Sequence, residues 1–215
     1  VRKIAEAVFE ILGKSGIAVY SKTAVEAFEA AGAQVDRQAR IVRLPRSLVE
    51  DAIDSNPSSI TLHSRNGDYD VVLERNRVHY ATGGTAIYVL DPETQQRRPS
   101  TTRDVIINAR MVEVLENIHA FTINVFPNEI ENKDHIDTNR FFHSLDNTHK
   151  HIMGGIYSLA GCRKVIQMAE MIAGGAEELR ARPFVSFITL IISPFKIDDD
   201  YGEITCHVAG KGLPI

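Results

Sequence analysis

The chain has 215 residues, of which 44% are hydrophobic and 24% are charged, a composition typical of a globular protein with a sizeable core. Its 24 basic and 28 acidic side chains give a formal net charge of −4, which argues against nucleic acid as the main partner because phosphate contacts need a concentrated basic face. No apolar run reaches the ~18 residues that span a bilayer, and the two cysteines have neither metal-binding nor redox spacing, so we expect a cytoplasmic protein with buried thiols.

The first third of the chain is expected to form a compact α+β unit. Apolar residues recur at helical spacing in three segments, each ended by glycine or by an Asn-Pro pair, while shorter stretches between them are extended or alternate like strands. These patterns predict helices at Val1–Leu12, Ala24–Ala31 and Arg46–Ser55, and extended segments at Ile17–Tyr20 and Arg40–Leu44.

The next part of the chain resembles an antiparallel meander. The Asn-Gly and Asp-Pro pairs that separate its strand-like segments are typical of hairpin and type I turns. The predicted strands are Ser59–Ser64, Tyr69–Leu73, Val78–Ala81 and Ala86–Leu90.

Gly83 and Gly84 interrupt this meander, and paired glycines allow another group to approach the backbone closely. They fit either a structural bend or a ligand-facing loop, and we take them as candidate cofactor-binding residues. After the meander, Thr101 and Asp104 resemble a capping box, which predicts a helix over Arg103–Glu116.

From His119 onward, a short apolar run followed by a helix-like segment repeats about every 30 residues, the length of a βα unit. Runs that are apolar on both faces are typical of buried parallel strands. The runs are His119–Phe126, His151–Tyr157, Phe184–Ile192 and the stub Gly212–Ile215. The crossover helices are predicted at Asp134–Leu145, Cys162–Ala173 and Asp198–Ala209.

This α/β repeat fits both a doubly wound sheet and a (β/α)8 TIM barrel. No GxGxxG or GxxxxGK[ST] motif follows the strands, so the phosphate-binding argument for the doubly wound fold is missing. The visible units do not complete a barrel or a large sheet. We therefore expect a piece of a longer protein, in which residues 1–117 form an amino-terminal α+β cap and residues 118–215 form about the first half of a TIM barrel.

Several segments, in order, carry a family resemblance: VRLPRSLVEDAI, HYATGGTAIYVLDPET followed by RRPST, and KHIMGG. Together they resemble the amino-terminal half of the trimethylamine methyltransferase family, the corrinoid-dependent methylamine and betaine methyltransferases. The resemblance implies a barrel whose centre binds a methylated amine, such as glycine betaine or trimethylamine, and passes one methyl group to the cobalt of a separate corrinoid (cobalamin) protein. By this resemblance, the founding trimethylamine enzymes carry pyrrolysine in the second half of the barrel, at a position beyond Ile215, while many relatives lack it and act on quaternary amines such as glycine betaine.

A quaternary ammonium has no N–H group, so its recognition depends on aromatic faces, a nearby carboxylate, and donors for any substrate carboxylate. In a barrel, such groups follow the carboxyl ends of the strands. The substrate-binding candidates at these positions are Phe126, Asn128, Glu129, Gly154, Gly155, Tyr157, Ser193 and Phe195. The three aromatic residues are the candidate cage, with core packing as the alternative for each. A solvated loop is the alternative for Glu129, and a tight strand end is the alternative for the two glycines.

Four histidines crowd one segment, His135, His143, His149 and His151, but none forms a chelating pair at helical spacing. We therefore predict no protein-bound metal, and the visible residues do not identify the catalytic groups. The expected partners are a small methylated amine, a corrinoid protein and further copies of the same chain. A hydrolase or lyase on the same barrel would need an acid/base pair or metal cluster, and a non-catalytic quaternary-amine binding or sensing protein remains the alternative function.

Overall fold

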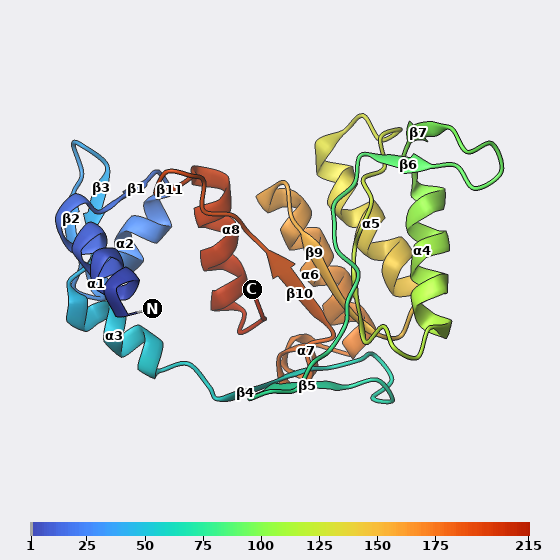
Figure 1. Cartoon of the computed structure of the whole chain (residues 1–215), viewed down its shortest axis with the longest axis horizontal. Coiled ribbons are helices and arrows are strands. Elements are labelled where there is room, and N and C mark those ends of the chain that lie inside the picture. Colours follow the sequence, from blue (N-terminus) through green and yellow to red (C-terminus); the bar gives the residue numbers. More distant parts are fainter. Residues whose placement is uncertain (1) are drawn as a thin grey trace. The chain divides into compact units, whose positions relative to one another are not determined.

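The computed structural model describes residues 2–215, which divide into two compact units (Figure 1). Unit 1 contains the described residues up to Ser58 together with Thr189–His207, and unit 2 contains Ser59–Ile188 together with Val208–Ile215. Neither unit is one continuous stretch of chain. The predicted division into a cap and a half barrel at residues 117 and 118 concerns the longer protein and stays a prediction.

Unit 1 is organised around a four-stranded mixed sheet with the order β11-β1-β3-β2. The central strand β1 runs parallel to β11 and antiparallel to β3, which in turn pairs antiparallel with β2. The strands are β1 (Ile17–Val19), β2 (Gln34–Asp36), β3 (Ile41–Arg43) and β11 (Lys196–Ile197). The sequence did not predict β2, because its polar ends hide the single apolar residue between them.

The helices of unit 1 follow the predicted positions closely. They are α1 (Arg2–Glu10), continued by a π-helical turn at Ile11–Ser15, α2 (Lys22–Ala30), α3 (Arg46–Asp54) and the first part of α8 (Asp199–Gly210). The Ser21 hydroxyl caps α2 by accepting a hydrogen bond from the Ala24 N–H at 3.0 Å, and it donates to Glu203 at 2.7 Å. Ile17, Val19, Ala24 and Val42 form the buried core of this unit.

Unit 2 contains the predicted parallel sheet. Its strands β8 (Ala120–Thr122), β9 (His151–Gly155) and β10 (Val185–Ile188) lie in the order β10-β9-β8, and both neighbouring pairs are parallel. The connecting helices are α5 (Lys133–Asn147) and α6 (Leu159–Ala173), with the short α7 (Ala176–Ala181) before β10 and α4 (Thr102–Val114) before β8. The repeat of parallel strands and crossover helices is therefore confirmed, whereas the predicted stub at Gly212–Ile215 forms no strand.

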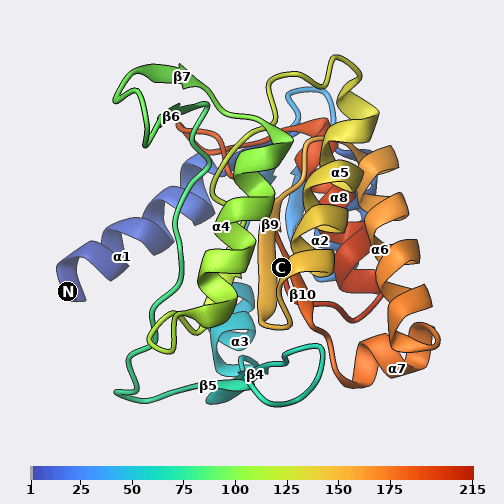
Figure 2. The same cartoon turned by 90° about the vertical axis from the view of Figure 1, so that its right-hand side faces the viewer.

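The two faces of the parallel sheet differ. Helices α4, α5 and α6 lie side by side over one face (Figure 2), where Phe121, Ile152 and Val185 are fully buried. The residues that alternate with them on the opposite face include Met153 and Gly155, which are partly exposed. The sheet thus has one packed face and one face that becomes accessible toward the carboxyl ends of its strands.

The antiparallel part of the prediction is half right. Strand β4 (Ser59–Leu62) pairs antiparallel with β5 (Val71–Glu74), and β6 (Tyr88–Leu90) pairs antiparallel with β7 (Arg97–Pro99). The segment between these hairpins, residues 81–86, does not join the meander.

The prediction of an antiparallel strand at Val78–Ala81 is wrong, because Ala81 instead makes a parallel bridge with Ala120 of β8. Five residues later, Ala86 makes a second parallel bridge with Val125. Local turn chemistry could not show this, because the pairing partner lies about 40 residues further along the chain. Residues 81–86, which we call the edge segment, therefore extend the parallel arrangement beside β8.

Two further features complete the description. The capping box predicted at the start of α4 is confirmed, with the Asp104 carboxylate accepting the Thr101 N–H at 2.8 Å. Within residues 2–215, no helix has the length and apolar character that crossing a membrane requires.

Candidate functional site

The candidate site lies in unit 2, at the carboxyl ends of β8 and β9 and beside the edge segment. Here β8 leaves β9: the last ladder hydrogen bond joins the Ile123 N–H to the Met153 carbonyl at 2.8 Å. The residues that follow β8 stay paired with the edge segment, where the Ala86 N–H donates to the Asn124 carbonyl at 2.8 Å. The carboxyl ends of parallel strands are where α/β proteins bind ligands, so this divergence is a natural place for a site.

Arg140 of α5 fills the gap between the diverging strands. Its guanidinium donates to the Gly155 carbonyl at 3.2 Å, the Ile123 carbonyl at 3.3 Å and the Thr85 hydroxyl at 3.2 Å. The side chain is fully buried, and burial lowers the pKa of Arg140 although its interactions with Tyr157 and Asp137 oppose this shift. One buried cation thus joins the ends of β8, β9 and the edge segment.

Tyr157 and Phe126, two of the predicted cage residues, lie together at this end of the sheet. Their ring centroids are 5.7 Å apart with an interplanar angle of 75°, an edge-to-face contact. Both side chains are half-buried. Arg140 also lies over the Tyr157 ring, with 5.1 Å between its guanidinium carbon and the ring centroid.

Asp137, one turn before Arg140 on α5, holds the loop after β9. Its carboxylate accepts the backbone N–H groups of Tyr157 at 3.0 Å and Ser158 at 3.2 Å. The side chain is fully buried, and burial raises its pKa to about 6 although those hydrogen bonds and Arg140 act in the opposite direction. Asp137 therefore fixes the backbone of Tyr157, while Arg140 stacks on its ring.

Asn128 and Glu129 lie in the same region, but their polar groups bind the protein itself. The Asn128 amide donates to the carbonyls of Ile87 at 2.8 Å and Ser100 at 2.9 Å. The Glu129 carboxylate accepts the Thr102 N–H at 2.7 Å, at the start of α4. Burial raises the pKa of Glu129, but the hydrogen bonds with Thr102 outweigh it and leave the pKa below its ordinary value. Asn128 thus holds the loop after β8 against the residues that flank the β6–β7 hairpin, and Glu129 holds it against the start of α4.

The four candidate glycines fall into two classes. A Cβ on Gly154 would lie 2.7 Å from the Phe141 ring, and one on Gly84 would lie 2.6 Å from the Asn124 backbone, so both glycines allow close packing. Gly155 and Gly83 have no atom within 4 Å of that position. Close packing therefore explains why Gly84 and Gly154 have no side chain, while Gly83 and Gly155 border open space.

Ser193 and Phe195 belong to unit 1, where they lie exposed in the turn before β11. The Phe195 carbonyl accepts the Ala18 N–H at 2.8 Å, and the residue has a positive φ of 50°. The structure brings Phe126 and Tyr157 together and does not position Ser193 or Phe195 relative to them.

Sequence reasoning missed Arg140, Asp137 and Thr85. A signal was present for the first two, because they are charged residues on the same helical face as the buried Ile136 and Phe141. Charged residues on a buried face are almost always paired or hydrogen-bonded, so this pattern marks a polar network under the helix.

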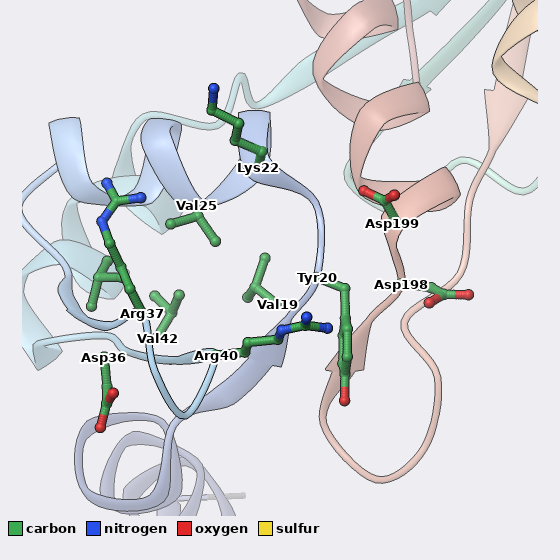
Figure 3. Close-up of a pocket in the computed structure, with 11 residues that line it drawn as sticks. Val19, Tyr20, Lys22, Val25, Asp36, Arg37, Arg40, Val42, Asp198 and Asp199 are labelled. Carbon is green, nitrogen blue, oxygen red and sulfur yellow. The ribbon is translucent and has the colours of Figure 1, made fainter.

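Unit 1 contains a separate cavity of about 360 Å³ beside the β2–β3 hairpin (Figure 3). Three basic and three acidic side chains line it, namely Lys22, Arg37, Arg40, Asp36, Asp198 and Asp199. Arg37 is ion-paired with Glu29, and Arg40 lies 5.0 Å from the Tyr20 ring centroid. This balance gives the cavity no charge preference. Among the described residues, no three His, Cys, Asp or Glu side chains are grouped as metal ligands.

The family model for trimethylamine methyltransferase (MTTB) matches residues 1–215. The chain belongs to this family. The trimethylamine methyltransferase MttB of Desulfitobacterium hafniense is 34% identical over 206 residues, which cover 96% of this chain and 41% of that protein. The MttB of Methanosarcina thermophila is 24% identical over 213 residues, covering 97% of this chain and 44% of that protein.

Relatives in the family differ in the substrate that their names give. A glycine betaine methyltransferase of Desulfitobacterium hafniense is 27% identical over 203 residues, covering 93% of this chain and 41% of that protein. The chain thus spans about two fifths of the length of the curated relatives it matches. The resemblance predicted from the sequence is confirmed, and the relatives described here are named as trimethylamine and glycine betaine methyltransferases.

Proposed function

We propose that the full-length protein transfers a methyl group from a methylated amine, such as trimethylamine or glycine betaine, to the cobalt of a corrinoid carried by a partner protein. The observation that carries this proposal is the Phe126–Tyr157 pair at the carboxyl ends of parallel strands, in a chain of the trimethylamine methyltransferase family. Aromatic faces are the groups that recognise an ammonium without N–H donors. The proposal includes a (β/α)8 barrel, of which the sheet β8–β10 would be one part.

In the proposed reaction the bond between nitrogen and one methyl carbon breaks, and nitrogen keeps the electron pair and leaves as an amine with one methyl group fewer. Reduced cobalt would supply the nucleophile that accepts the methyl group. The task of this chain is then to hold the ammonium, align the methyl–nitrogen bond and exclude water.

The residues at the site fit this task in part. Gly155 and Gly83 leave open space beside the strand ends, where a substrate and the group that accepts its methyl would need room. Gly84 does not, because its backbone lies against Asn124. Of the two candidate cofactor-binding residues we therefore retain Gly83.

A methyl-transfer assay with the full-length protein tests the proposal. The protein is incubated with reduced cobalamin and either trimethylamine or glycine betaine, and we expect methylcobalamin together with dimethylamine or dimethylglycine in equal amounts. Formaldehyde should be absent from the products, because an oxidative demethylase would release formaldehyde instead of methylcobalamin.

The same experiment separates the alternative function. A protein that binds glycine betaine but yields no methylcobalamin, with or without a corrinoid protein, would favour quaternary-amine binding or sensing. The cage assignment is tested by alanine at Phe126, Tyr157 and Phe195 together. If glycine betaine affinity is unchanged in that triple variant, these residues do not form the amine site.

A further inference from the structure

We infer that Phe126 is the ring that contacts the ammonium group of the substrate, and that Tyr157 is a positioning residue whose ring face is already occupied by Arg140. This inference rests on the proposed function, because it assigns separate roles to the two rings of the proposed amine site. It depends on the buried guanidinium of Arg140, which lies over the Tyr157 ring.

Arg140 cannot move away from the Tyr157 ring without losing its other partners. Three oxygens hold the guanidinium, those of Gly155, Ile123 and Thr85, at 3.2 to 3.3 Å. The side chain is fully buried, so water does not replace these bonds if the side chain shifts. Asp137 in turn accepts a hydrogen bond from the Tyr157 backbone N–H, which holds the backbone that carries the ring. The stack is therefore a fixed part of the site.

A second cation on the Tyr157 ring would meet this fixed charge. A guanidinium on one face and an ammonium on the other would lie about 10 Å apart, and at an effective dielectric constant of about 20 their repulsion is as large as a cation–π attraction. The ring would then contribute little to ammonium binding. Its contribution is to pack edge-to-face against Phe126 and fix the orientation of that ring.

Phe126 differs from Tyr157 in having no cation on its ring. None of the cation–π contacts among residues 2–215 involves Phe126, and its side chain, like that of Tyr157, is partly exposed at the strand end. Its backbone is held on both sides, because its N–H donates to the Ala86 carbonyl at 2.9 Å and its carbonyl accepts the Ser100 hydroxyl at 2.6 Å. A rigid aromatic ring with no competing cation is therefore available to an ammonium group.

The test uses a pair of probes that differ only in charge. Glycine betaine and 3,3-dimethylbutanoate have the same shape, but the second has carbon in place of the positive nitrogen. The ratio of their dissociation constants reports recognition of the ammonium charge, and general damage to the site affects both probes alike. Calorimetry on the full-length protein measures this ratio for wild type, Phe126→Leu and Tyr157→Leu.

We expect Phe126→Leu to reduce the preference for glycine betaine about threefold to tenfold, and Tyr157→Leu to change it less than twofold even where both affinities fall. A larger loss of preference in Tyr157→Leu than in Phe126→Leu would overturn the inference. Equal affinity of the wild type for both probes would overturn it too, without affecting the methyl-transfer assay. If the wild type binds neither probe and transfers no methyl group, the proposed function fails as well. The methyl-transfer assay therefore distinguishes failure of the proposed function from failure of this inference alone.

Discussion

Asp137 provides a quantitative test of the polar network beneath the site. It is fully buried, and its pKa is raised to about 6, from an ordinary value of about 3.9 for an aspartate side chain. The folded protein thus holds this proton more tightly than the unfolded chain does. Replacing it by asparagine, Asp137→Asn, removes the titration and retains nearly the same shape.

The magnitude follows from the difference in pKa. At 1.36 kcal/mol for each tenfold change in proton affinity, ionising Asp137 in the folded state costs about 3 kcal/mol in total. This loss of stability is absent below the unfolded pKa of about 3.9, grows as the pH rises from about 3.9 to about 6, and is constant at higher pH. Between pH 4.5 and pH 7.5 the wild type should lose about 2 kcal/mol from this group alone.

Urea unfolding of the full-length wild type and of Asp137→Asn at the two pH values measures this effect. Other carboxylates titrate in both proteins, so they cancel in the difference between the two unfolding free energies. The asparagine amide oxygen still accepts from the Tyr157 and Ser158 N–H groups, and the weaker hydrogen bonds of this neutral acceptor lower the stability of the variant by an amount that does not depend on pH.

We therefore expect the stability of Asp137→Asn relative to wild type to increase by about 2 kcal/mol from pH 4.5 to pH 7.5. A difference that stays constant would show that the pKa of Asp137 is close to its ordinary value. A change of opposite sign would show that Arg140 and the two N–H groups outweigh burial, and would refute the reasoning.

Two matched pairs of variants test the packing around the site. Gly154→Ala should lower the unfolding free energy by about 1–3 kcal/mol, because the new Cβ would meet the buried Phe141 ring, while Gly155→Ala, which enters open space, should change it by less than 0.5 kcal/mol. Equal losses in the pair would contradict this placement of the strand faces. Glu129→Ala should cost about 1 kcal/mol in thermal unfolding at neutral pH, because it removes an acceptor at the start of α4, and the exposed Glu131→Ala is its control. A control loss as large as that of Glu129→Ala would exclude the capping role.

The parallel part of the fold could be predicted because its signal is local. Each strand is a short apolar run, and each crossover helix is amphipathic, so His151–Tyr157 and Cys162–Ala173 needed no knowledge of their partners. The edge segment could not be predicted, because its partners lie about 40 residues further along the chain, with Ala81 beside Ala120 and Ala86 beside Val125. Turn chemistry on either side favoured an antiparallel reading there.

The site was predicted to a similar extent. Strand-end positions pointed to Phe126 and Tyr157, and the structure brings these two rings together. The same argument pointed to Asn128, whose amide is used within the protein. The strand-end argument could not reveal the role of Arg140. A sequence shows that a charged residue lies on a buried helical face, but not which three oxygens accept its hydrogen bonds.

The discontinuity of unit 1 has a consequence for biosynthesis. Strand β1 is made well before its parallel neighbour β11 and the Glu203 that binds Ser21, because about 176 residues separate Val19 from Lys196. At about 5–20 residues per second, the ribosome needs roughly 9–35 s to synthesise this stretch. During that interval the edge of β1 that will pair with β11 has no neighbouring strand, so its backbone N–H and C=O groups are open to pairing with another chain.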